Sequence, residues 1–316
     1  MWWIAKRMSR SISHQVQAAR GNCRLRLWET GMSQQSTDSK SVSIARTSPR
    51  APKYSGAKDR QFVTALARGL EILQCFSPSK PELGTAEIAE MIHLPQPTVW
   101  RLSYTMMKRG FLVYSPQQKK LRLGVPVLGL GYAVAASQPI GELARPYMQV
   151  IADQFQGAVS LGARDGLNMI YLQRCQGPSI IFTDFRVGSR VPMGSSSTGW
   201  AYLAGLETEA REELLKEIRS ANGARWAQTE QRFRAALKRY PDEGYIVNKG
   251  SLHPQINGVA VPIHFREGGE LLSVSAGGIS SVFTDKKLRV IGRSLVELAS
   301  SLAIVRHEQS TINASS

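Results

Sequence analysis

Cysteine is scarce in this sequence, and acidic residues are outnumbered by basic ones. The three cysteines among 316 residues are Cys23, Cys75 and Cys175, and their odd number and wide spacing exclude a disulfide framework and a zinc-finger pattern. No run of about 18 apolar residues occurs, so the sequence predicts no membrane-spanning helix and no membrane partner. Metal-ligand spacings and glycine-rich phosphate loops are also missing, so we expect no metal and no cofactor. This combination is typical of a protein of the reducing cytoplasm.

The net charge of +16 is concentrated in the first part of the chain. Residues 1–60 hold 12 Lys or Arg against 3 Asp or Glu, residues 61–125 hold 8 against 4, and residues 126–316 hold 20 against 17. The head, residues 1–60, lacks apolar periodicity and is predicted to be disordered. Its first apolar run is too short for a secretory signal. An organelle transit peptide and an over-extended gene start, with Met32 as the true first residue, are two further interpretations.

Residues 61–124 have the pattern of three helices followed by a hairpin. The first helix is predicted around the apolar residues Val63, Leu66, Leu70, Leu73 and Phe76, which recur at helical spacing. Thr85 is the expected N-cap of a short second helix. A third helix is expected to begin at Pro97 and to end at Gly110. Two strands are predicted at 111–114 and 121–123. This order is the plan of a winged helix-turn-helix.

The third helix is the predicted DNA-reading helix, because the second helix of a helix-turn-helix enters the major groove. Val99, Leu102 and Met106 are spaced to face the core, which leaves polar and basic residues outside. An exposed Trp at position 100 requires a packing partner. The expected DNA-contacting residues, on both sides of the turn and on the wing, are Thr85, Gln96, Thr98, Trp100, Arg101, Tyr104, Lys108, Lys119, Lys120 and Arg122. A helical hairpin with solvated charges, or a protein-binding module, is the alternative, and the basic wing favours double-stranded DNA.

The rest of the chain predicts a second domain in which strands and helices are grouped. This grouping favours an α+β class. The expected strands are at 158–163, 169–174, 179–185, 244–248, 257–265 and 270–276, and the expected helices are at 126–137, 140–156, 200–206, 208–219, 229–240 and 284–306. We therefore divide the ordered chain into a winged helix at 61–124, a linker helix at 125–138 and a second domain at 139–308.

Three motifs in the first domain resemble the IclR family of bacterial transcriptional regulators: ALARGLEILQCF, EIAEMIHLPQPTVWRL and KRGFLVYSPQQKKLRLG. The similarity continues through DGLNMIYLQR, GSRVPMGSSSTGWAYLAGL, EGYIVNKGS, INGVAVPI and LLSVSAGG. The resemblance implies a winged helix, a linker helix that helps to dimerise it, and a GAF-like domain that binds a small organic effector. It also implies a dimer or tetramer that represses or activates operons for the catabolism of organic acids and aromatics.

The resemblance also implies where the effector binds. The implied effector-binding residues, contributed by four segments of the second domain, are Ile180, Thr183, Ser197, Thr198, Asn248, Gly258, Ser273 and Ser275. The helix that follows Ser197 and Thr198 is expected to offer its positive end to a carboxylate. This chain departs from the family where Trp200 replaces a typical Lys, and where the segment 248–251 lacks the acidic residues of many relatives. Both departures concern the identity of the effector.

An enzyme is the alternative from another class, for example a small-molecule hydrolase with an appended DNA-binding domain. A serine hydrolase of this type needs G-x-S-x-G on a strand-to-helix turn, but Thr198 stands where the second Gly belongs. His93, His253 and His264 are candidate bases without a recognisable acid partner, and His93 is better placed to cap a helix. We therefore expect no catalytic residues. The predicted function is a DNA-binding transcriptional regulator that is controlled by a small organic effector, with a carboxylate or aromatic acid favoured.

Overall fold

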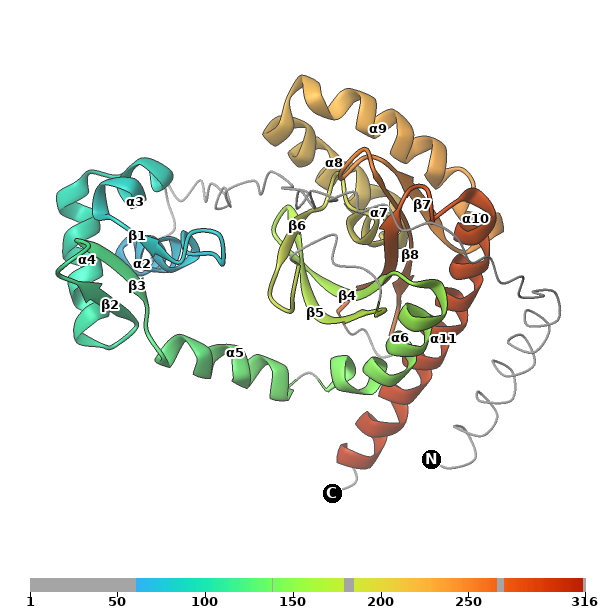
Figure 1. The fold of residues 1–316 in the computed structure, drawn as a ribbon, viewed down its shortest axis with the longest axis horizontal. Helices are drawn as coiled ribbons and strands as arrows, with labels where there is room; N and C mark the ends of the chain where they lie inside the picture. The colour runs from blue at the N-terminus through green and yellow to red at the C-terminus, as the bar shows by residue number, and fades with distance from the viewer. Residues whose placement is uncertain (1–60, 138, 179–184, 266–269, 315–316) are drawn as a thin grey trace, which may run out of the picture. The chain divides into compact units, whose positions relative to one another are not determined.

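The computed structural model describes residues 61–137, 139–178, 185–265 and 270–314 (Figure 1). The predictions for the basic head, and those for Ile180 and Thr183, lie outside the described residues. The chain forms a small N-terminal fold and a larger mixed fold of strands and helices. None of the helices in the described ranges has the length and apolar content needed to cross a lipid bilayer.

The N-terminal fold is the predicted winged helix. Its elements are α2 (Thr64–Gln74), β1 (Glu82–Leu83), α3 (Thr85–Ile92), α4 (Gln96–Lys108), β2 (Leu112–Ser115) and β3 (Lys120–Leu123). The strands form an antiparallel sheet in the order β1-β3-β2. The wing strands lie within one residue of their predicted positions. Strand β1 was not predicted, because the polar segment SPSKPELG has no strand pattern.

The start of α3 differs from the prediction. Thr85 is the first helical residue rather than the N-cap, which is Gly84. The backbone N–H of Gly84 donates to Glu87 Oε2 at 2.7 Å, so a carboxylate from the first turn satisfies the helix start. His93 ends the same helix in the left-handed conformation, with φ of 55°, as expected for a C-terminal cap. Pro97 takes the second position of α4, one residue later than predicted.

A compact apolar core holds the winged helix together. Its fully buried members come from α2, α3, α4 and the sheet, and they are Ile72, Cys75, Leu83, Ile88, Val99, Leu112 and Leu121. Leu102 and Met106 pack against this core as predicted. The apolar residues that predicted the first helix do not all face this core, because Val63, Leu66 and Leu70 are each more than half exposed. Helix α2 therefore buries the face that carries Ile72 and leaves a second apolar face uncovered.

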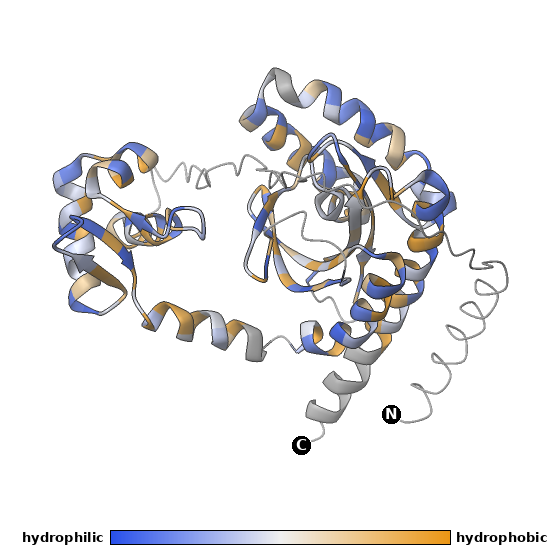
Figure 2. Ribbon diagram, in the orientation of Figure 1, coloured by the Kyte–Doolittle hydropathy of each residue, from blue (hydrophilic) through white to orange (hydrophobic). Residues whose placement is uncertain are grey.

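Helix α5 (Pro126–Ser137) follows the wing and matches the predicted linker helix. Its apolar residues Leu128, Leu130, Tyr132 and Val134 are all more than half exposed, and the hydrophobic colour of this helix is visible in Figure 2. These residues lie on more than one side of the helix, and so much exposed apolar surface is unusual for a helix that lies alone in water.

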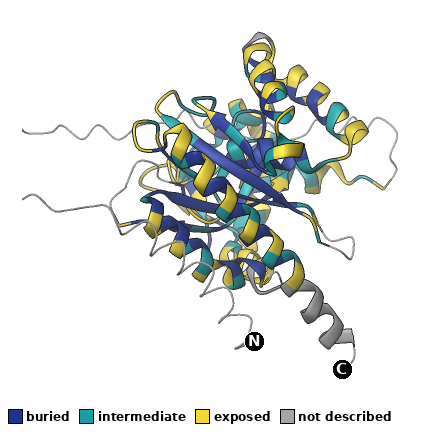
Figure 3. Cartoon of the chain, turned by 90° about the vertical axis from the view of Figure 1, so that its right-hand side faces the viewer, coloured by how far each residue is buried: buried dark blue, intermediate teal, exposed yellow. Residues whose placement is uncertain are grey.

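The second fold is built on a curled antiparallel sheet. Among the described residues its six strands run in the order β6-β5-β4-β9-β8-β7. The strands are β4 (Ala158–Asp165), β5 (Asn168–Gln176), β6 (Arg190–Pro192), β7 (Ile246–Lys249), β8 (Ile256–Ile263) and β9 (Leu272–Ile279). Figure 3 shows that these strands are largely buried and that the helices around them expose one side. Strand β6 at the edge was not predicted, because it is only three residues long.

Helices cover both faces of this sheet. On one face α6 (Ile140–Phe155) and α11 (Asp285–Ala314) pack over a core that includes Met148, Leu161 and Leu295. On the other face lie α7 (Ser197–Gly205), α8 (Thr208–Asn222) and α9 (Ala224–Leu237), and the short α10 (Tyr240–Glu243) leads back to the sheet. Helix α9 begins earlier and α11 ends later than the sequence predicts.

Candidate functional site

The outer face of α4 carries the residues that were predicted to contact DNA. Gln96, Trp100, Arg101, Tyr104 and Lys108 are exposed. Thr98 and Thr85 are half-buried. The face therefore presents two cations, amide and hydroxyl groups and two aromatic rings, which together match the phosphates, base edges and thymine methyls of a major groove.

A hydrogen bond joins the two helices on either side of the turn. Gln96 Nε2 donates to Thr85 Oγ1 at 3.1 Å. Because Gln96 is the first residue of α4 and Thr85 the first of α3, this bond fixes the two helix starts relative to each other. Both side chains thus have a structural role in addition to the predicted contact with DNA.

Trp100 has the packing partner that its exposure requires. Its ring meets the ring of Tyr114 edge-to-face, with the centroids 5.9 Å apart, and the residue is still 42% exposed. Tyr114 lies on β2, so the contact connects the predicted reading helix with the wing. Pairs of this geometry stabilise by about 0.5–1.5 kcal/mol beyond their buried area.

The basic residues of the wing differ in their surroundings. Lys119 and Arg122 are exposed, whereas Lys120 is half-buried and lies 4.0 Å from the carboxylate of Glu87 on α3. At the end of α4, Lys108 lies over the ring of Tyr104 at 5.4 Å. A partly exposed ion pair of this length contributes little, so it holds Lys120 only weakly.

A cavity opens on the α7 side of the large sheet. It is lined by small, polar and aromatic residues, namely Ala158, Ser160, Tyr171, Arg174, Phe185, Ser197, Asn248, Leu252, Ile256, Gly258, Ser275 and Gly277. The strand pairing explains the hollow, because Ala158, Gly277 and Gly258 are successive cross-strand neighbours. Three residues with little or no side chain thus form one row of the sheet and leave space beneath α7.

Of the six described residues that the resemblance implies, four line this cavity: Ser197, Asn248, Gly258 and Ser275. Thr198 and Ser273 do not line it. Ser273 Oγ donates to the backbone carbonyl of Thr198 at 2.9 Å, and the Thr198 and Ser275 hydroxyls lie 2.8 Å apart. These groups fasten the first turn of α7 to strand β9 below the cavity.

Gly258 allows α7 to approach the sheet. A Cβ atom at this position would lie only 2.7 Å from Ser197 Oγ, so any side chain would displace the helix or the serine. Ser196 caps α7 by accepting from the backbone N–H of Gly199 at 3.1 Å, and the helix begins at Ser197. The Asn248 side chain makes two hydrogen bonds with the backbone: its Nδ2 donates to the carbonyl of Ser195 at 2.8 Å, and its Oδ1 accepts from the N–H of Ser251.

The sequence prediction missed the other eight residues of the cavity wall, and four of these carry its polar and aromatic character: Ser160, Tyr171, Arg174 and Phe185. Arg174 Nη1 donates to Ser160 Oγ at 2.8 Å. Burial raises the pKa of the Tyr171 hydroxyl, although the charge of Arg174 opposes this. The signal was an arginine inside the apolar strand MIYLQR, because a cation in a half-buried strand needs a reason to be there.

The Ser-rich turn serves as a helix start rather than as a nucleophile elbow. Its Ser196 hydroxyl is the N-cap of α7, and His253 Nδ1 accepts from the backbone N–H of Gln255. Within the described ranges, no group of three His, Cys, Asp or Glu residues is placed to hold a metal ion.

Comparison with known families assigns both folds. The sequence model of the IclR helix-turn-helix domain matches residues 65–116. The model of the C-terminal domain of bacterial IclR transcriptional regulators matches residues 132–304, which is more than half of the chain. The chain belongs to the IclR family of bacterial transcriptional regulators.

Individual members of the IclR family support the assignment. The chain is 35% identical to the HTH-type transcriptional regulator TsaQ1/TsaQ2 of Comamonas testosteroni over 202 residues. The aligned region covers 63% of this chain and 72% of that relative. A crystal structure of an IclR family regulator from Brucella abortus is 38% identical, with a TM-score of 0.71, over 78% of this chain and 94% of that protein. An IclR homologue from Microbacterium hydrocarbonoxydans, solved in complex with 4-hydroxybenzoate, shares the fold with a TM-score of 0.62 at 23% identity, over 76% of this chain and 98% of its own.

The IclR assignment confirms the predicted α+β fold, with its winged helix and appended regulatory domain, and the predicted class of transcriptional regulator. The relatives are named as regulators, not as enzymes, which favours the first of the two predicted classes of function.

Proposed function

We propose that this IclR-family regulator binds a DNA operator under the control of a small organic acid that occupies the cavity beneath α7. The observation that carries the proposal is the cavity itself, because four residues implied by the family resemblance line it together. The domain limits that go with this function are 61–124 for DNA binding, 125–138 for the linker and 139–308 for effector binding. The place of action is the cytoplasm, where the operator is found.

The lining of the cavity supports an acid with an apolar body. Ser160, Ser197 and Ser275 supply hydroxyl groups, and Tyr171 and Phe185 supply an aromatic wall. Ser197 is also the first residue of α7, so the positive end of this helix dipole faces the cavity and favours a carboxylate. The complex of the Microbacterium homologue with 4-hydroxybenzoate makes aromatic acids the first compounds to test.

The DNA-binding role is assigned to the exposed face of α4 and to the wing. Arg101 is the principal candidate for a phosphate or base contact, since it is exposed on the outer face of α4. Gln96, Thr98, Trp100, Tyr104 and the basic wing residues complete the surface. The exposed apolar residues of α5 support self-association into a dimer or tetramer, because packing this helix against a second copy removes part of their surface from water.

The test measures operator binding with and without candidate acids. Duplexes that bind the full chain are selected from a random-sequence pool, and binding is then followed by fluorescence anisotropy. Benzoate, 4-hydroxybenzoate, phenylacetate and hexanoate are added in turn. An acid at about 100 times its dissociation constant stabilises the folded protein by about 2.7 kcal/mol, so a thermal shift accompanies any change in DNA affinity.

Two variants separate the effector site from the DNA site. Ser197→Trp fills the cavity and is expected to abolish the response to the acid while DNA binding is retained. Ser220→Trp places the same side chain on an exposed position of α8 and is the matched control, which should respond as the wild type does. A Ser197→Trp protein that still responds would place the effector elsewhere, and a failure to select any duplex would contradict the DNA-binding role.

A further inference from the structure

Strand β5 contains a bulge at the edge of the cavity. Leu161 of β4 pairs with Gln173, and the next residue, Gly162, pairs with Tyr171. Leu172 is therefore an extra residue on β5. In a regular strand Tyr171 and Arg174 would point to opposite faces, because side chains alternate. The bulge shifts this alternation by one residue, so both side chains point to the α7 face.

Contacts with Ser160, Tyr171 and Phe185 orient Arg174 in the cavity. Its Nη1 donates to Ser160 Oγ at 2.8 Å. The centre of the guanidinium group lies 5.6 Å from the ring of Tyr171 and 5.9 Å from the ring of Phe185, and these two rings pack edge-to-face at 6.0 Å. Stacking against aromatic rings and a fixed hydrogen bond limit the rotamers of the side chain. Arg174 thus lines the cavity as an oriented cation.

The cation lies at one end of a polar row that crosses the sheet. Arg174 pairs with Ser160, and Ser160 pairs with Ser275. The Ser275 hydroxyl lies 2.8 Å from the Thr198 hydroxyl at the first turn of α7. The neighbouring row, Ala158, Gly277 and Gly258, leaves the hollow. A ligand in this hollow is therefore flanked by hydroxyl groups along its length and by a guanidinium group at the β5 end.

Arg174 is a stronger anion ligand than the start of α7. The Gly199 N–H is already bonded to Ser196, and the Thr198 hydroxyl to Ser275. A guanidinium group carries a full positive charge, and its planar fork of N–H groups matches the geometry of a carboxylate. Burial lowers the pKa of Arg174, but a guanidinium remains charged at neutral pH, and its attraction for an anion is increased in a low-dielectric setting.

We propose that Arg174, aimed by the bulge at Leu172, binds the acid group of the effector, with Ser160 as the residue that positions it. This inference rests on the proposed function and specifies it further: the effector carries an anionic group at the β5 end of the cavity and an aromatic or aliphatic body over the small-residue row. A neutral analogue of the same shape is accordingly a poor ligand.

The experiment compares acids with their neutral amides. Benzoate, 4-hydroxybenzoate, phenylacetate and hexanoate are each paired with the corresponding amide, and affinities for the full chain are measured by calorimetry. The wild type is expected to prefer the acid. Arg174→Gln should bind the acid about tenfold to a hundredfold more weakly, as expected for the loss of a charge-assisted hydrogen bond, with less than about threefold change for the amide. Arg164→Gln, at an exposed arginine of β4, is the matched control and should match the wild type.

Each outcome separates this inference from the proposed function. If the wild type prefers the acid and Arg174→Gln retains that preference, Arg174 is not the anion ligand, although the acid effector stands. If the wild type binds none of the acids, or binds amides equally well, the acid-effector proposal fails and this inference fails with it. Arg174→Lys keeps the charge but loses the fork, so an intermediate acid preference supports the inference even where Arg174→Gln does not fold.

Discussion

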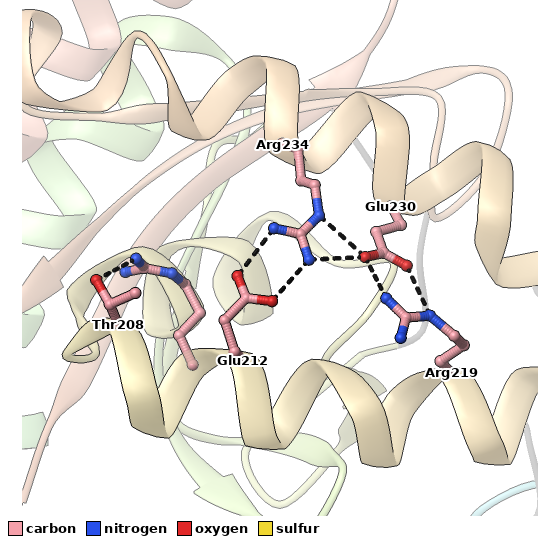
Figure 4. A network of polar contacts seen from close by, with 6 residues as sticks. Thr208, Glu212, Arg219, Glu230 and Arg234 are labelled. Atoms are coloured by element: carbon pink, nitrogen blue, oxygen red, sulfur yellow. Dashed lines mark hydrogen bonds and ion pairs between the residues drawn. The ribbon is translucent and has the colours of Figure 1, made fainter.

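A cluster of ion pairs between α8 and α9 allows a quantitative prediction about stability. Figure 4 shows Glu230 of α9 between Arg219 of α8 and Arg234 of α9. Its carboxylate accepts from Arg219 at 2.7 and 3.2 Å and from Arg234 Nε at 3.0 Å, while Arg234 also donates twice to Glu212 at 2.8 Å. The Glu230 side chain is only 12% exposed. Removing its charge therefore leaves two cations facing a neutral amide.

The expected effect of Glu230→Gln is a loss of about 2 kcal/mol of folding stability at neutral pH. Charge-assisted hydrogen bonds contribute about 1.5–3 kcal/mol each, and we take a low total because Arg219 and Arg234 are 53% and 40% exposed and solvent screens them. For a domain of this size, about 2 kcal/mol corresponds to a fall of about 4–8 °C in the melting temperature.

The effect depends on pH in a defined direction. Burial alone would raise the pKa of Glu230, but its hydrogen bonds with Arg219 and Arg234 outweigh burial and lower the pKa. The ionised carboxylate thus stabilises the fold above the unfolded pKa of about 4.3, and this contribution is lost as the pH falls through the lower folded value. The difference in free energy of unfolding between wild type and Glu230→Gln should have its full size at pH 7 and should disappear below about pH 4.

Urea unfolding followed by circular dichroism at several pH values measures this difference. Glu217→Gln, at an exposed glutamate of the same helix α8, is the control and should change stability by less than about 0.5 kcal/mol. A Glu230→Gln protein as stable as the control at pH 7, or a difference that grows towards acid, would refute the reasoning.

Two predictions concern the DNA-binding part. Arg101→Ala should weaken operator binding. If Arg101 contacts a phosphate, the slope of log K against log salt should fall by about one on all sequences, whereas the loss of a base contact should cost about 1–3 kcal/mol at one base pair. Unchanged binding in a salt titration would contradict the placement of α4 in the major groove. Leu130→Asp places a charge among the exposed apolar residues of α5, and it should shift the protein towards monomer in sedimentation and weaken operator binding at least tenfold. An intact dimer that binds DNA normally rules out the α5 contact.

The winged helix was predictable because its signals are local. Helical spacing, Gly110 after α4 and the strand-forming residues of the wing each act within a few residues. The errors have local causes too. Thr85 was assigned as the N-cap because threonine suits that position, but Glu87 satisfies the Gly84 N–H from inside the helix. The face of α2 was misjudged because Val63, Leu66 and Leu70 recur at helical spacing, and only the fold shows that these residues are exposed and Ile72 is buried.

The cavity was only partly predictable, because it depends on strand register. The resemblance pointed to Ser197, Gly258 and Ser275, which do line it. It did not distinguish them from Ser273, whose hydroxyl does not line the cavity and instead donates to the backbone carbonyl of Thr198. Arg174 was missed because its direction is set by the extra residue in β5, and a bulge has no clear signature in the strand pattern of one sequence.

Trp200 has a mechanical consequence for the regulatory domain. Its indole Nε1 donates to the carbonyl of Gly194 at 2.7 Å, and its ring packs edge-to-face on Phe233 of α9 at 5.6 Å. The residue is 1% exposed, so the turn before α7, the helix itself and α9 are closely packed into one block. A ligand that pushes on Ser197 therefore cannot shift α7 alone. Any shift of α7 would have to include Trp200 and, through its contact with Phe233, the α8–α9 hairpin.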